Sequence, residues 1–187
     1  MKSQRNLMLY LYGNFDLPFV LMATLTYAKK VYDMKTTIKD FKKFRLKFRE
    51  KFPNAVWIAV YEFHEDGSTH IHFIFKNAPG ANHVILTDMW KNGMAYITKF
   101  ESEKIPYFCK KERLDMYPSG TKLYTKSLNC KMPTPVNMSV ETYENITKNL
   151  ECVSSNAKTL YKVEHTTLAA KPVNTFIYKK FKRKKEN

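Results

Sequence analysis

Two histidines stand one residue apart, at His70 and His72, in a run of β-branched and aromatic residues. Side chains alternate between the two faces of a strand, so two imidazoles at this spacing lie on the same face. The carboxylate of Glu62 lies eight residues upstream. Two imidazoles and one carboxylate can hold a divalent metal ion and leave coordination positions open for a substrate. These three residues therefore form a candidate metal site.

The segment between Glu62 and His70 contains Asp66-Gly67, a turn signal that predicts a β-hairpin. A two-residue turn would pair Glu62 with Ile71 and place the carboxylate on the face opposite the histidines. A three-residue loop that ends on a left-handed Gly67 in a bulge would instead pair Glu62 with His70. The metal site therefore requires the odd-length loop.

A second candidate for chemistry is the pair Tyr107 and Lys110, which project from the same side if they lie on a helix. A free tyrosine hydroxyl ionises only near pH 10. A neighbouring ammonium group favours the phenolate and stabilises charge that develops on a phosphorane. In a chain with 12 tyrosines, this spacing alone is more typical of a core tyrosine beside a solvated lysine. Taken alone, the histidine pair is likewise compatible with two half-buried histidines on an amphipathic strand.

These residues must be positioned by an architecture in which strands and helices are mixed, which predicts an α+β fold with an antiparallel sheet. Phenylalanines recur at helical spacing after Thr37, which we expect to cap that helix. Strands are expected at residues 7–12, 20–27, 56–63, 70–75, 94–100, 159–165 and 173–179, and helices at residues 37–52, 83–90, 102–114 and 139–151.

Length and composition limit the organisation of the chain. A length of 187 residues with 44% hydrophobic residues suffices for one domain with a real core. We expect this domain over residues 1–178, with its core at 19–130 and a C-terminal extension at 131–178, followed by a basic tail at 179–187. No apolar run is long enough to span a bilayer.

The charge and the cysteines indicate the kind of partner and the compartment. A net charge of +15 favours a polyanionic partner, with nucleic acid ahead of an anionic membrane. A generally basic, well-solvated surface is the alternative. The three cysteines form no CxxC pair, so a reducing cytosol fits better than a disulfide framework.

The order of the motifs resembles that of a known family. Thr24-Leu25-Thr26-Tyr27, then Glu62 with His70-Ile71-His72, then Tyr107-Phe108-Cys109-Lys110 are similar to the motifs of HUH-superfamily replication initiators. Those Rep endonucleases serve rolling-circle plasmids and single-stranded DNA phages and viruses. The resemblance extends from about Leu21 to Ser127. It implies a ferredoxin/RRM-like HUH endonuclease fold, a five-stranded antiparallel sheet flanked by helices with the histidine strand at its centre.

The resemblance also implies roles for individual residues. Glu62, His70 and His72 would bind Mn2+ or Mg2+, Tyr107 would be the nucleophile and Lys110 its assistant. The implied activity is nicking and rejoining of origin DNA through a 5′-phosphotyrosine, which leaves a 3′-hydroxyl for a polymerase. Single-stranded DNA or an extruded origin hairpin would be the substrate. The chain has no GxxxxGK(S/T) loop, so a host helicase and polymerase are expected partners, in the cytoplasm of a bacterial or archaeal host, near the nucleoid.

Two other interpretations stay open at the level of the sequence. A relaxase or a small single-strand transposase shares the metal site. A relaxase would use Tyr10 or Tyr12 as nucleophile and would need a third histidine, for which His64 or His83 could substitute. A non-catalytic module that binds single-stranded DNA or RNA would also be basic and rich in aromatic residues.

Overall fold

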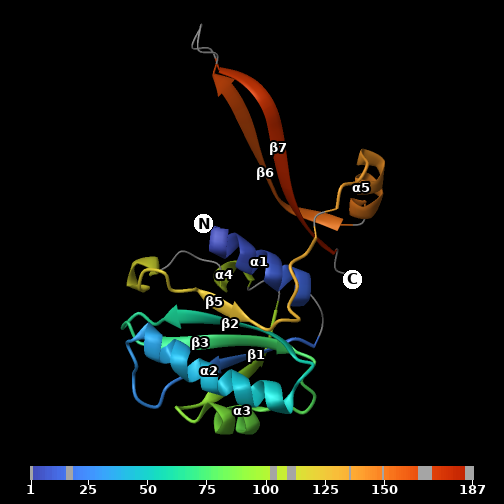
Figure 1. Ribbon diagram of the computed structural model, residues 1–187. Helices are drawn as coiled ribbons and strands as arrows, with labels where there is room; N and C mark the ends of the chain where they lie inside the picture. Colours follow the sequence, from blue (N-terminus) through green and yellow to red (C-terminus); the bar gives the residue numbers. More distant parts are fainter. Residues whose placement is uncertain are drawn as a thin grey trace. The chain divides into compact units, whose positions relative to one another are not determined.

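The computed structural model describes residues 2–15, 19–101, 105–108, 113–134, 136–148, 150–163 and 170–183. The chain divides into two compact units, Met1–Thr134 and Pro135–Asn187. The first unit is built on a five-stranded antiparallel sheet in the order β4-β1-β3-β2-β5 (Figure 1). The strands are β1 (Leu21–Leu25), β2 (Val56–Phe63), β3 (Thr69–Lys76), β4 (Ala95–Lys99) and β5 (Tyr124–Lys126). The histidine strand, β3, is central, which confirms the predicted fold class.

Helices α2 (Met34–Lys51) and α3 (His83–Trp90) cover one face of this sheet (Figure 1). The predicted phenylalanine stripe forms the centre of that layer, because Phe41, Phe44 and Phe48 are all buried. Their rings pack edge-on against the ring of Phe73 on β3 or tilt against it, with centroids 4.8 to 5.8 Å apart. This aromatic layer fixes β3 from one side of the sheet.

The N-terminal cap of α2 differs from the prediction of Thr37. Asp33 is the cap, and its carboxylate accepts hydrogen bonds from the backbone N–H groups of Lys35 and Thr36 at 3.1 and 3.0 Å. Thr37 is buried one turn later, and its hydroxyl lies 2.6 Å from that of Thr69 on β3. Thr37 therefore ties the helix to the histidine strand instead of starting the helix.

The first helix, α1 (Lys2–Phe15), corrects the prediction of a strand at residues 7–12. Leu7, Leu11 and Phe15 recur at intervals of four residues and are fully buried, which is the pattern of a helix with one apolar face. The apolar run itself is too short to distinguish a helix from a strand. Gly13 permits a close approach to the 131–134 segment, because a Cβ atom there would lie 2.2 Å from Cγ of Pro133.

Helix α1 packs on the second face of the sheet, against apolar side chains that include Ile58, Val60 and Ile74. Further along the same strands, residues of the same alternation are polar: Thr24, Glu62, His70 and His72. The sheet face therefore changes from an apolar part under α1 to a polar part at the hairpin end. The polar part is where the candidate chemistry lies.

The region after β4 is only partly described. A short helix, α4 (Ile105–Phe108), and a 3-10 turn, η2 (Leu114–Met116), fall at or near the ends of the helix predicted at 102–114. Residues 102–104 and 109–112 lie outside the described residues, and Lys110 is among them. Tyr107 is described, and it lies on α4.

The second unit contains α5 (Val140–Thr147), β6 (Leu150–Val163) and β7 (Ala170–Arg183). The side chain of Ser139 caps α5, as the helix predicted from Ser139 requires, but β6 already begins at Leu150. The two strands form a long antiparallel ribbon (Figure 1), and each extends beyond the strand predicted in its region. None of the described helices combines the length and the apolar character that a membrane span needs.

Candidate metal centre

The register of the β2–β3 hairpin decides whether the candidate ligands can meet. The structure pairs Glu62 with His70, as the odd-length loop requires. His64 donates its backbone N–H to the carbonyl of Ser68 at 2.7 Å, and Gly67 donates to the carbonyl of His64 at 3.0 Å. Gly67 is left-handed, with a φ of 81°. The predicted three-residue loop with its bulge is confirmed, and Glu62 faces the histidines.

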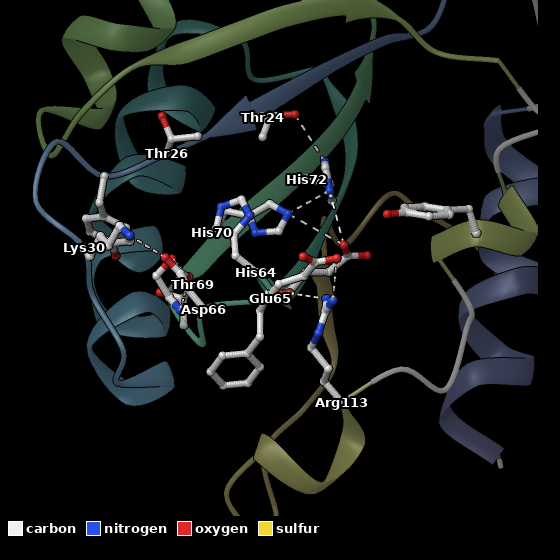
Figure 2. A pocket seen from close by; sticks show the side chains of 15 residues that line it. Thr24, Thr26, Lys30, His64, Glu65, Asp66, Thr69, His70, His72 and Arg113 are labelled. Carbon is white, nitrogen blue, oxygen red and sulfur yellow. Dashed lines mark hydrogen bonds and ion pairs between the residues drawn. The ribbon is translucent and has the colours of Figure 1, made fainter.

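The three ligand atoms form a compact triangle on the polar part of the sheet. The Nε2 atoms of His70 and His72 are 3.0 Å apart. The Oε2 atom of Glu62 lies 3.3 Å from Nε2 of His72 and 3.7 Å from Nε2 of His70. Figure 2 shows the two labelled histidine side chains converging within the pocket.

This triangle has the size that metal ligands require. Nitrogen and oxygen ligands about 2.1 Å from an ion lie about 3.0 Å apart at a right angle and about 3.4 Å apart at the tetrahedral angle. The three observed separations are close to that range. Among the described residues, Glu62, His70 and His72 are the group of this kind that could hold a metal ion. The residues present therefore fit a divalent cation with protein ligands on one side only.

Thr24 orients the imidazole of His72. Its hydroxyl lies 3.2 Å from Nδ1 of that ring, and β1 places Thr24 directly opposite His72. If Nδ1 carries the proton and donates it to the hydroxyl, Nε2 is left with its lone pair aimed at the triangle. The sequence motif contained Thr24, but its spacing to His72 gave no sign of this contact, which depends on the β1–β3 register.

His70 is held by burial and ring packing. Its side chain is 8% exposed, its ring stacks on that of His64 at 4.0 Å between centroids, and its Nδ1 has no hydrogen-bond partner among the described residues. Burial lowers the pKa of His70 to about 3, and the positive charges of His72, His64 and Arg113 act in the same direction. The ring is therefore neutral at pH 7, which is the state that binds a metal, and its contact with Glu62 is not an ion pair.

A pocket of about 850 Å³ joins the metal group to other functional candidates (Figure 2). Tyr107 lines this pocket from α4 and is 53% exposed. The structure thus brings Tyr107 into the same pocket as the three ligands, although about 40 residues separate it from them in sequence. Lys110, the predicted assistant, lies outside the described residues.

The residues held in reserve for other interpretations are placed differently. His64 lines the pocket and stacks on His70, but it is outside the metal group. His83 begins α3, on the layer that covers the opposite face of the sheet. Tyr10 packs against the ring of Tyr124 and is not among the residues that line the pocket.

The rim of the pocket carries charged residues that the sequence patterns missed. Lys30 contacts Asp66 at 2.6 Å, and that pairing together with hydrogen bonds from Ser68 holds the pKa of the Asp66 carboxyl well below its usual range. Arg113 lies beside Glu65 and donates to a backbone carbonyl at the end of β2. No spacing rule connects Arg113 to the histidines, because the path of the chain after α4 brings it there.

Comparison with known proteins adds one match. Residues 20–113 match the model of a family of replication-associated proteins, the ORF2 type. The matched segment begins just before β1 and ends at Arg113, so it contains the metal group and Tyr107. No curated protein and no solved structure matches the chain.

Proposed function

The chain belongs to this ORF2-type family of replication-associated proteins, and on this premise we propose that it is an HUH endonuclease that nicks single-stranded DNA at a replication origin. Nicking would start rolling-circle replication. The observation that carries the proposal is the convergence of Glu62, His70 and His72, with Tyr107 lining the same pocket. A strand-transfer enzyme of this kind needs a divalent cation and a nucleophile at one place.

The donor set is suited to Mn2+ or Mg2+, because a carboxylate and open positions for water or phosphate oxygens fit these ions, and imidazoles bind Mn2+ as well. When bound, such a cation would act as a Lewis acid on the scissile phosphodiester. The chain supplies the rest of the site. Burial keeps the ring of His70 neutral, and Thr24 fixes the orientation of His72.

Tyr107 is the proposed nucleophile. Its hydroxyl oxygen would attack phosphorus, a new O–P bond would form, and the bond from phosphorus to the 3′-oxygen would break. The phenolic proton would be released, and the departing 3′-oxygen would take up a proton to become a hydroxyl. The products would be a 5′-phosphotyrosine and a free 3′-hydroxyl that a polymerase can extend. Lys110 would favour the phenolate at the start of this step.

Binding of the substrate would rest on the basic character of the chain. A net charge of +15 favours attraction of the phosphate backbone before any specific contact forms. An unpaired strand, or the loop of an extruded hairpin, can enter an open pocket that a closed duplex cannot. The host would supply the helicase and the polymerase.

The test mixes the purified protein with a labelled single-stranded origin oligonucleotide and Mn2+ and looks for a protein–DNA adduct that survives SDS. We expect an adduct with the natural chain and none with Tyr107→Phe. Tyr96→Phe is the matched control, because Tyr96 on β4 is also 53% exposed, and it should keep the adduct. An adduct that survives Tyr107→Phe would overturn the choice of nucleophile, and the relaxase interpretation would then direct attention to Tyr10 and Tyr12.

Removal of the metal separates the enzyme from a simple binding module. Chelation with EDTA should abolish nicking and leave much of the DNA binding intact. DNA binding without an adduct on any origin sequence, with or without metal, would favour the non-catalytic module instead.

A further inference from the structure

Arg113 stands at the edge of the metal centre, and the proposed function so far gives it no part. Its Nη1 atom donates a hydrogen bond to the carbonyl of Phe63 at 2.9 Å. Its Nη2 atom lies 3.8 Å from a carboxylate oxygen of Glu65. Figure 2 shows the side chain of Arg113 pointing toward Glu65 at the edge of the pocket. Arg113 thus reaches the same cavity as the metal group and Tyr107.

A fixed positive charge at this place opposes the binding of a metal cation nearby. The charge of Arg113 is already one of the causes that disfavour protonation of His70, so it acts on the ligands themselves. Glu65 offsets little of it, because this carboxylate is 95% exposed and an exposed pair at that distance contributes little. Lys30, the other basic residue on the pocket wall, is matched by Asp66 at 2.6 Å.

Two positive centres side by side are compatible when an anion lies between them. Arginine presents five donors in a planar fork, and the bond to Phe63 uses only one of them. That bond also fixes the direction of the guanidinium group, so the remaining donors are held in place before a ligand arrives. A planar, preoriented donor group of this kind suits phosphate oxygens.

We propose that Arg113 and the metal centre form one anion subsite, which holds an oxygen of a backbone phosphate of single-stranded DNA. The inference rests on the proposed function, because it assigns a substrate contact within the same pocket. The bound phosphate would neutralise the repulsion between the arginine and the cation. DNA and metal should therefore bind cooperatively, and Arg113 should favour the DNA while disfavouring the metal alone.

The test uses Arg113→Gln, with Lys42→Gln as a control of equal charge change. Lys42 is exposed on α2, in the layer on the opposite face of the sheet. Both changes are made in a Tyr107→Phe background, so that binding is measured without covalent capture. Fluorescence anisotropy with a labelled origin strand and Mn2+ then gives the affinity across a series of salt concentrations.

We expect Arg113→Gln to weaken DNA binding about 10- to 100-fold, the loss of one charge-assisted hydrogen bond. The slope of log affinity against log salt should become shallower by about 0.7, the value for one phosphate contact on a single strand. Lys42→Gln should leave both unchanged. In calorimetric titration with Mn2+ and no DNA, Arg113→Gln should bind the metal at least as tightly as the parent.

A merely structural role for Arg113 predicts a different pattern. Loss of the bond to Phe63 would then disturb the end of β2, and affinity for Mn2+ would fall together with affinity for DNA. That result, or DNA binding equal to that of Lys42→Gln, would overturn the subsite. Glu65→Gln provides a variant of opposite sign, because it removes the competing carboxylate and should tighten DNA binding; weaker binding would also count against the subsite. Failure of the natural chain to form an adduct would overturn the proposed nicking and leave these binding results to be judged separately.

Discussion

The buried imidazole of His70 should make the stability of the metal-free protein fall in mild acid. Its pKa is lowered from 6.5 to about 3 in the folded chain, chiefly by burial. The unfolded chain therefore binds this proton in a pH range where the folded chain does not. The stabilisation is complete above pH 6.5 and is lost as the pH falls toward 3.

The size of the effect follows from the same pKa shift. The free energy of unfolding changes by up to about 1.4 kcal/mol for each pH unit in this window. Between pH 7 and pH 5 the expected contribution of His70 is about 2 kcal/mol, which is a large share of the stability of a small domain. Carboxylates titrate mainly at lower pH, so this interval separates the imidazole from most of them.

The assay is urea unfolding in the presence of EDTA at pH 7, 6 and 5, for the natural chain and for His70→Gln. The variant has no titrating group at this position, so its stability should fall by about 2 kcal/mol less over the interval. His83→Gln is the control, because His83 is exposed at the start of α3, and it should follow the natural chain. Parallel pH curves for the natural chain and His70→Gln would refute the reasoning.

Three further outcomes follow from the geometry. Thr24→Val removes the hydroxyl that orients His72 and should weaken Mn2+ binding about 10- to 100-fold in calorimetric titration, whereas Thr26→Val, on the adjoining segment, should not. Gly67→Ala forces a left-handed alanine and should cost about 1–2 kcal/mol in urea unfolding and also weaken Mn2+ binding; Gly80→Ala has a similar φ and should cost stability alone. Mn2+ at 100 times its dissociation constant should add about 2.7 kcal/mol to the stability of the natural chain, and EDTA should reverse this gain.

The parts of the fold that could be predicted are those with a long or strict pattern. The phenylalanines of α2 recur over four turns, so their helical period is unmistakable, and β2 was predicted at its observed bounds, 56–63. The hairpin loop could be predicted only conditionally, because the sequence allows either parity. The requirement that Glu62 face the histidines selected the odd-length loop with Gly67, and the structure has that loop.

The elements that were missed depend on contacts between distant segments. α1 was mistaken for a strand because its apolar run is short, and its helical period extends over buried residues as far as Phe15. Asp33 and Thr37 are both good capping residues, and the choice between them was decided by the contact of Thr37 with Thr69 on β3. Arg113 reaches the pocket through the fold of the chain after α4, which no local pattern encodes.

The central position of β3 explains why so few residues suffice for the site. A central strand has a neighbour on each side, and here each neighbour supplies one partner: β2 places Glu62 opposite His70, and β1 places Thr24 opposite His72. A slip of one residue in the β2 register would turn the carboxylate to the phenylalanine layer, and a slip in the β1 register would remove the hydroxyl from the ring. The apolar residues of the same strands oppose both slips, because each would also expose core side chains and bury polar ones. The packing that stabilises the sheet and the geometry that creates the metal site are therefore fixed by the same two strand registers.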